Sequence, residues 1–328
     1  MGTIYSRAKV FHYREALDHL PRHVEGIGPP IHIRIKPTNI CNHRCWYCSY
    51  RLKGVQLGQD MDERDVIPHD KMMEIVDDLV AMRVRAVTFS GGGEPFCYPH
   101  LEETVLRLAD GGVRFASLTN GSRLTGSIAE VFAHRGVWLR ISIDGWDDES
   151  YARQRRVAHG EFTRVLANMR AFKRLKGPCH LGVALVVDQT LAPHVAELIE
   201  RVCETGADSV KVAPCILSNV AQENNDYHAP LFEEVKRQIA VAKERFRDEA
   251  VEIFDSYHQQ LETFAKSYHW CPYLQLNPVI GADRNVYTCH DKAYNLKEGL
   301  LGSLRDRRFR LLDDGQGPVF PHRSVAPL

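Results

Sequence analysis

Between residues 31 and 214, segments with two different spacings of apolar residues follow one another in turn. Short runs, apolar throughout or at every second position, predict strands, and longer stretches with apolar residues three or four apart predict helices. The predicted strands cover residues 31–36, 86–90, 114–119, 138–143, 180–187 and 209–213. The predicted helices between them cover residues 69–83, 99–110, 125–135, 161–176 and 192–205.

Strands that alternate with helices over short connections indicate an α/β fold with a parallel sheet. The spacing does not distinguish an open sheet from a barrel. In both architectures, ligands bind at the carboxyl ends of the strands. Side chains that follow the predicted strands are therefore the first candidates for a functional site.

The two ends of the chain differ from this α/β region. A helix is expected at residues 14–23, before a Gly-Pro turn, and the tail from Gly315 is expected to run over the surface. After Pro214 the sequence predicts a polar loop, a charged helix that ends near residue 248, and a small unit with a hairpin that ends at Cys289. We therefore expect an N-terminal extension, an α/β domain and a C-terminal unit, at residues 1–29, 30–215 and 216–328.

Composition excludes several classes of partner. The 42 basic and 42 acidic residues of this 328-residue chain cancel, which argues against nucleic acid as a partner. No apolar run approaches the roughly 18 residues of a membrane helix, and the N-terminus lacks an apolar signal core. Nine cysteines at uneven spacing do not suggest a secreted disulfide framework. We expect a soluble cytoplasmic protein that acts on a small molecule.

Three cysteines follow the first predicted strand in one loop. Cys41, Cys45 and Cys48 are spaced C-x3-C-x2-C. Thiolates clustered this tightly bind iron-sulfur clusters or zinc. Structural zinc sites usually take four ligands, commonly from two separated cysteine pairs, whereas no fourth cysteine follows here within forty residues. Three ligands on a four-iron cluster would leave one iron open to a substrate or cofactor.

With Tyr47 before the last cysteine, this loop resembles the hallmark motif of the radical S-adenosylmethionine (SAM) superfamily. After the second strand, Gly92, Gly93 and Glu94 resemble the Gly-Gly-Glu element that holds the amino group of SAM in that superfamily. The resemblance implies a partial, six-stranded (βα)6 TIM-like barrel, here with the N-terminal helical extension and a small C-terminal α+β unit. It also implies a SAM-binding 4Fe-4S cluster, SAM, and an external one-electron reductant of the flavodoxin or ferredoxin type.

Two strand ends supply further candidate SAM contacts. Asn120 ends the third strand, although Asn-Gly is also an ordinary turn sequence. At the end of the fourth strand, the resemblance favours Ser142 over Asp144 as a contact for the ribose or carboxylate of SAM. It also implies a basic residue for the carboxylate. We choose Arg153 from the three arginines at positions 153, 155 and 156, because guanidinium binds carboxylate in bidentate geometry.

The remaining cysteines fall into two groups. Cys97, Cys179 and Cys203 are interpreted as small packed side chains. Cys271 and Cys289 flank the C-terminal hairpin and resemble the auxiliary-cluster modules of the superfamily, SPASM and its shorter relative twitch. The hairpin glycine of those modules is replaced here by Arg284, and no cysteine follows Cys289.

Cys215, just after the sixth strand, is a candidate third ligand of this second iron-sulfur cluster, and His290 is a less favoured fourth. If Cys215 is not a ligand, it is a candidate catalytic residue that donates a hydrogen atom.

The resemblance implies an enzyme that forms a 5′-deoxyadenosyl radical from SAM and removes a hydrogen atom from its substrate. The small C-terminal unit resembles that of relatives which act on sugars, aminocyclitols or nucleotide sugars. We therefore expect dehydrogenation or epimerisation of a small, polar, sugar-like molecule. The alternatives are radical modification of a peptide side chain and, in another class, a non-catalytic metal-binding module.

Overall fold

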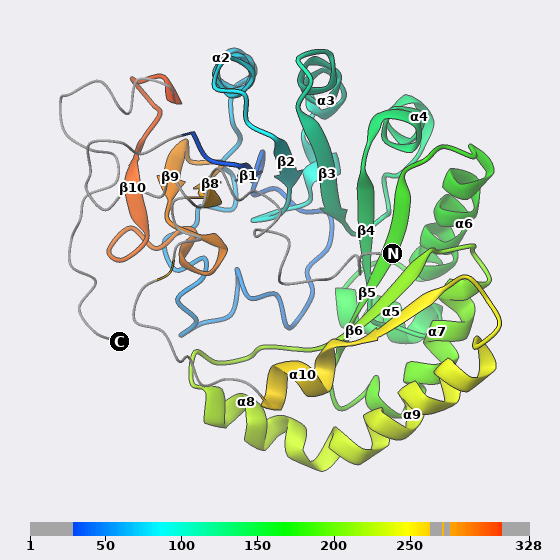
Figure 1. Ribbon diagram of the computed structural model, residues 1–328. Helices are drawn as coiled ribbons and strands as arrows, with labels where there is room; N and C mark the ends of the chain where they lie inside the picture. Colours follow the sequence, from blue (N-terminus) through cyan, green and yellow to red (C-terminus); the bar gives the residue numbers. More distant parts are fainter. Residues whose placement is uncertain (1–28, 263–270, 272–275, 310–328) are drawn as a thin grey trace.

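The computed structural model describes residues 29–262, 271 and 276–309. The helix expected at residues 14–23 and the tail from Gly315 lie outside the described residues. One sheet runs through the described part of the chain, with the strand order β10-β9-β8-β1-β2-β3-β4-β5-β6-β7. The sheet curves and carries helices along its outer side, which confirms the expected α/β partial barrel (Figure 1).

Six parallel strands form the centre of the sheet at the positions that the sequence predicts. They are β1 (His32–Ile35), β2 (Ala86–Phe89), β3 (Arg114–Thr119), β4 (Trp138–Ile143), β5 (His180–Val187) and β6 (Ser209–Pro214). Each pairs in parallel with the next strand along the chain. Their carboxyl ends therefore lie at one edge of the sheet.

Helices on the outer side connect these strands (Figure 1). The predicted ones are α2 (His69–Ala81), α3 (Leu101–Asp110), α4 (Gly126–Arg135), α6 (Glu161–Arg174) and α7 (Val195–Cys203). Short 3-10 turns, η2 (Pro95–Cys97) and η3 (Ala192–His194), precede α3 and α7. A further helix, α5 (Asp148–Arg155), is not predicted by the sequence pattern.

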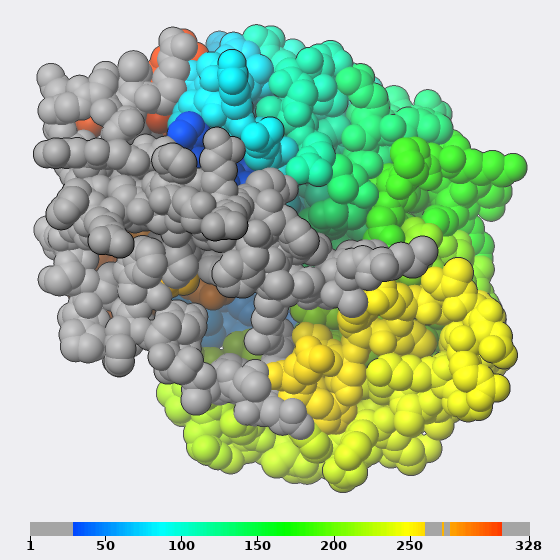
Figure 2. Space-filling model, viewed as in Figure 1, coloured from blue at the N-terminus to red at the C-terminus, as the bar shows by residue number. Residues whose placement is uncertain are grey.

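The sheet continues beyond the six expected strands. β7 (Glu252–Asp255) pairs in parallel with β6, so seven parallel strands follow one another. The connection contains α8 (Ala221–His228), η4 (Ala229–Leu231) and α9 (Phe232–Arg245), and α10 (Ser256–Glu262) follows β7. Part of the expected polar loop is therefore helical. In Figure 2, the yellow and yellow-green atoms of this segment form a continuous surface along one edge.

The expected C-terminal hairpin is present and extends the other edge of the sheet. β8 (Val279–Ile280) is parallel to β1, and β9 (Asn285–Tyr287) is antiparallel to both β8 and β10 (Leu300–Ser303). A 3-10 turn, η5 (His290–Lys292), lies between β9 and β10. Arg284 has a φ of 65°, a left-handed conformation that costs a non-glycine residue about 1–2 kcal/mol. Glycine adopts this conformation without that cost.

The two faces of the central strands have different chemistry. Toward the helices, the sheet packs an apolar core that includes Ile33, Val87 and Ile141. Residues one position away along each strand face the concave side, because successive side chains alternate. We call this side the inner wall, and Arg34 of β1 and Arg140 of β4 are among its polar residues.

No helix in the described part of the chain is long and apolar enough to cross a lipid bilayer. All nine cysteines are free thiols. Cys179 is buried in the core and Cys203 packs against it, which confirms their predicted packing role.

Candidate active site at the cysteine loop

The loop between β1 and α2 crosses the concave side of the sheet (Figure 1). Its entry is fixed by backbone hydrogen bonds that run from Asn39 to Asp65 and from Ile67 to Pro37. Cys41, Cys45 and Cys48 are each half-buried, and burial raises the pKa of Cys41 to about 12. A metal that binds these thiols must therefore displace protons. Three soft donors in one loop fit an iron-sulfur cluster with an open iron.

The carboxyl end of α5 holds the middle of the cysteine loop. The Arg44 amide donates to the Arg155 carbonyl at 2.9 Å, and the Trp46 amide donates to the Gln154 carbonyl at 3.2 Å. The last carbonyls of a helix lack partners within the helix, so they are available to the loop. α5 begins with a capping box at Asp147 and Ser150, a local signal that could have revealed it.

A buried ion pair lies beneath this contact. The Asp144 and Arg155 side chains are 1% and 4% exposed, and Arg155 Nε lies 3.1 Å from Asp144 Oδ2. Burial alone would lower the pKa of Arg155, but Asp144 and neighbouring Tyr47 raise it well above its ordinary value. The Tyr47 hydroxyl also donates a hydrogen bond to Asp144. Tyr47 is thus tied to the end of β4 as well as to the cysteine loop.

The ion pair between Asp144 and Arg155 corrects the choice of Arg153 from the three arginines of this segment. The Arg153 side chain is 65% exposed and forms an ion pair with Glu149 at 3.4 Å. Residues two apart on a helix do not share a face, so Arg153 and Arg155 point to different sides of α5. Arg155 is the arginine inside the site. Ser142 is half-buried on the inner wall, on the same side of β4 as Asp144.

The glycine element packs directly on the start of the cysteine loop. The amide of Gly93 donates to the Thr38 carbonyl, and the amide of Glu94 to the Ile40 carbonyl, both at 3.0 Å. A Cβ atom on Gly93 would lie 2.2 Å from the Ile40 oxygen, and one on Gly92 would lie 2.0 Å from Asn39 Oδ1. Only glycine permits this approach. The structure thus brings together the two motifs that the sequence singled out.

Glu94 is buried, and its carboxylate accepts three hydrogen bonds. They come from the Phe96 amide at 3.0 Å, the Thr119 hydroxyl at 2.6 Å and the Asn120 amide at 2.7 Å. Burial raises the pKa of Glu94, and these hydrogen bonds act in the opposite direction. Because a carboxylate offers about four acceptor positions, one remains for a ligand.

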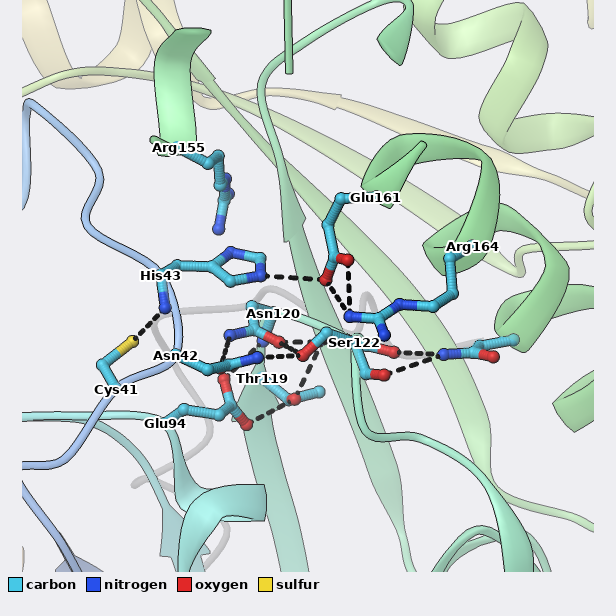
Figure 3. Close-up of polar contacts among 12 residues, drawn as sticks. Cys41, Asn42, His43, Glu94, Thr119, Asn120, Ser122, Arg155, Glu161 and Arg164 are labelled. Carbon is cyan, nitrogen blue, oxygen red and sulfur yellow. Dashed lines mark hydrogen bonds and ion pairs between the residues drawn. The ribbon is translucent and has the colours of Figure 1, made fainter. Parts of the chain in front are cut away.

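A polar network connects this carboxylate to the cysteine loop (Figure 3). Asn120 donates from Nδ2 to Asn42 Oδ1 at 2.9 Å, and its Oδ1 accepts from the Ser122 amide at 2.9 Å. The second contact is ordinary turn chemistry. His43 Nε2 lies 3.2 Å from Glu161 Oε1, and burial lowers the pKa of His43 to about 4. No sequence pattern marks Asn42 or His43 except their place between cysteines.

Two further cysteines have informative neighbours. Cys97 is half-buried and its Sγ lies 3.7 Å from Asn42 Oδ1, so it contacts the cysteine loop instead of packing away from it. Cys215 is 1% exposed, with its Sγ 3.7 Å from His228 Nε2. Burial raises the pKa of Cys215 to about 12, which keeps the thiol protonated.

Cys289 lies in a different environment, near Arg34 of the inner wall, and burial raises the pKa of its thiol. Cys271 is half-buried, and the residues that follow it lie outside the described part. Cys215 contacts α8, whereas Cys289 follows β9 at the other end of the strand order. A metal centre shared by these three cysteines stays a prediction.

Replacement of Glu94 by Gln tests its predicted contact with the amino group of SAM. We expect the affinity for SAM to fall about tenfold or more, because a hydrogen bond to a charged group contributes roughly 1.5–3 kcal/mol. Iron content should stay near that of the wild type, since Glu94 is not an iron ligand. Equilibrium binding of SAM to the reconstituted protein measures the effect.

Thr119→Val is the matched control for this experiment, because it removes one hydrogen bond to Glu94 and keeps the carboxylate. If both variants lose SAM affinity equally, Glu94 only shapes the turn.

Comparison with known proteins agrees with the geometry. A family model described as the radical SAM superfamily matches residues 35–198, half of the chain. The dTDP-4-amino-4,6-dideoxy-D-glucose ammonia-lyase of Streptomyces venezuelae is 28% identical over 53% of this chain and 36% of its own length. An S-adenosylmethionine-dependent nucleotide dehydratase of Psychrobacter lutiphocae is 24% identical over 56% of this chain and 64% of its own length. The chain thus spans less than two thirds of either relative.

Among solved structures, Streptococcus suis SuiB bound to the precursor peptide SuiA matches with a TM-score of 0.64 and 15% identity. The match covers 92% of this chain and 68% of SuiB, and it shows a shared fold. A 4Fe-4S cluster and SAM are the cofactors of the matched family, and three half-buried thiols beside a closely packed glycine turn fit them. Motif, geometry and family match all lead to one assignment, and this chain belongs to the radical SAM superfamily.

Proposed function

We propose that this radical SAM enzyme removes a hydrogen atom from a small, polar, sugar-like or nucleotide-linked substrate. The observation that carries the proposal is the direct packing of the Gly92–Glu94 turn on the cysteine loop. When bound, the cluster and SAM supply a 5′-deoxyadenosyl radical. The chain's own residues would bind and orient these cofactors and exclude water around them.

Each candidate residue has a distinct task in this proposal. Cys41, Cys45 and Cys48 hold the cluster, and an external flavodoxin- or ferredoxin-type protein supplies the electron. Gly92 and Gly93 let SAM approach the backbone, and Glu94 accepts from its amino group. Asn120, Ser142 and Tyr47 complete the surroundings of SAM. Asp144 and Arg155 act indirectly, since they position Tyr47 and the cysteine loop.

The substrate class is supported by the relatives. Their names refer to a dTDP-linked amino sugar and to a nucleotide. Both are polar molecules that join a sugar ring to phosphate. We carry over the chemical class, and propose that a ring carbon of such a molecule loses the hydrogen atom.

Two outcomes of the substrate radical remain as proposals. Oxidation by a second cluster at Cys271 and Cys289 would give a dehydrogenated product. Return of a hydrogen atom from Cys215 would give an epimer and a thiyl radical at Cys215, which one electron from the external reductant and one proton would restore to the thiol. The protonated, buried thiol of Cys215 beside His228 and Tyr227 supports the second outcome, because a hydrogen-atom donor must keep its S–H bond.

The test is substrate-dependent formation of 5′-deoxyadenosine by the reduced holoenzyme. A nucleotide sugar from a small panel should raise the rate about tenfold or more above the rate without substrate, because only a bound substrate can consume the radical. Mass spectrometry of the product distinguishes dehydrogenation, which lowers the mass by two hydrogen atoms, from epimerisation, which leaves the mass unchanged. If peptides raise the rate of 5′-deoxyadenosine formation and no nucleotide sugar does, the proposed substrate class is wrong.

A further inference from the structure

Two cationic side chains stand next to each other on the inner wall. Arg34 and Lys36 are two residues apart along β1, and therefore point to the same side. Lys36 is 0% exposed, and Arg34 Nε is buried without a hydrogen-bond partner. Within the part of the chain that the structure describes, neither side chain forms an ion pair with a carboxylate.

The groups that surround Lys36 are polar but do not neutralise it. Its Nζ donates to the Gly91 carbonyl at 2.6 Å and to the Tyr50 hydroxyl, and lies 3.3 Å from His290 Nδ1. Two buried cationic groups side by side are costly in their charged forms, because each loses hydration and repels the other, and both effects lower the pKa of Lys36 well below its ordinary value. Arg140 of β4 also repels Arg34. Asp291 is a described carboxylate whose charge favours the charged forms of Arg34 and Lys36, but it is exposed and forms an ion pair with neither. No buried carboxylate among the described residues pairs with these two side chains.

A second buried atom without a hydrogen-bond partner, besides Arg34 Nε, lies beside Lys36. Ser90 follows β2, and its amide donates to the Ile35 carbonyl, which places it next to Lys36 across the β1–β2 pair. Its side chain is 1% exposed, and its Oγ has no hydrogen-bond partner. A buried hydroxyl without a partner is uncommon and indicates a missing ligand or water.

We propose that Arg34, Lys36 and Ser90 bind an oxyanion of the substrate, a phosphate or a carboxylate. Arg34 Nε and Ser90 Oγ are free to donate hydrogen bonds, and the Lys36 ammonium would exchange its 3.3 Å contact with His290 for a third. Guanidinium and ammonium groups both bind such oxyanions. The proposal rests on the proposed function and narrows it, because it favours an anionic substrate over neutral sugars and over cationic aminocyclitols. Lys36 contacts Gly91 of the glycine element and Tyr50 of the cysteine loop, so the bound anion would lie beside the SAM site.

The experiment compares one sugar with and without a phosphate. Binding of glucose 1-phosphate and of glucose is measured by anaerobic calorimetry on the holoenzyme in the presence of SAM. We expect glucose 1-phosphate to bind about tenfold or more tightly, since hydrogen bonds to charged groups carry the difference. Arg34→Gln and Lys36→Met should each abolish the preference, and Ser90→Ala, which keeps both charges, should reduce it.

Arg85→Gln is the matched control, because it removes the same charge from an exposed position just before β2. It should leave the preference unchanged. Equal affinities for the two sugars in the wild type, or a preference that survives in both charge variants, would overturn the proposal.

The carboxylate of SAM is the other oxyanion that this site could take. Affinity for SAM and reductive cleavage of SAM are therefore measured on the same samples, and both should stay near wild type in Arg34→Gln. A parallel loss of SAM affinity would assign the cations to SAM and overturn the substrate proposal. Absence of SAM cleavage in the wild type would instead refute the proposed function, whatever the sugar phosphate affinity.

Discussion

Protein reconstituted without oxygen should cleave SAM to 5′-deoxyadenosine and methionine on reduction, and the triple variant Cys41→Ala, Cys45→Ala, Cys48→Ala should lose this activity completely. The three thiols come from one loop, and three ligands on a four-iron cluster leave one iron open for SAM. Chromatographic detection of 5′-deoxyadenosine measures the loss. Cys203→Ala, on α7 and packed against the core, is the control and should keep full activity.

The same triple variant tests for the second cluster. If Cys271 and Cys289 hold one, with Cys215 as a further ligand, the variant should retain about four irons per chain, as expected for one cubane. Adding Cys271→Ala and Cys289→Ala should then remove them. A folded triple variant without iron would show that one cluster is present, and Cys215 would become the preferred hydrogen-atom donor. Reductive SAM cleavage by the triple variant would refute the central assignment.

The six central strands could be predicted because each is apolar on at least one face and is bounded by turn residues. Two of the elements that the sequence did not predict, α5 and β7, lack this signal. α5 has the sequence DESYARQR, which carries no apolar stripe, so its capping box at Asp147 is its main local mark. β7 has four half-buried residues at the end of the sheet, and its partner β6 lies some forty residues earlier. Pairing between strands so far apart in the sequence leaves little trace in the local spacing of apolar residues.

The candidate site also contains residues that the sequence pointed to and residues that it did not. Motif spacing singled out Cys41 and Glu94 as candidates, because the motifs that contain them are short and local in the sequence. It did not identify Arg155 over Arg153, since both lie in one charged run and only the orientation of α5 separates them. Nor did it indicate Lys36, whose buried position depends on contacts with Gly91 and residues of the C-terminal unit.

Breaking the buried pair between Asp144 and Arg155 should have a large effect on stability. Arg155→Met leaves the Asp144 carboxylate buried without its partner, and loss of one member of such a pair costs about 3–5 kcal/mol of unfolding free energy. Urea unfolding of the apoprotein, followed by circular dichroism, measures the change. Arg153→Met is the matched control, because its ion pair with Glu149 is exposed and contributes little.

The pair should also affect the cluster. Arg155 and Gln154 hold the cysteine loop through their carbonyls, and Asp144 accepts from Tyr47. Arg155→Met keeps these groups but leaves the Asp144 carboxylate buried without its charged partner, which should loosen the end of α5 that holds the loop. We expect it to lose iron faster than Arg153→Met when both are exposed to a chelator. The double variant Asp144→Leu, Arg155→Met removes both charges and should recover part of the stability, because a buried ion pair can often be replaced by apolar residues. It should not recover iron retention, since Asp144→Leu removes the acceptor of the Tyr47 hydroxyl. Equal stability of the two arginine variants would show that the pair does not hold this site together.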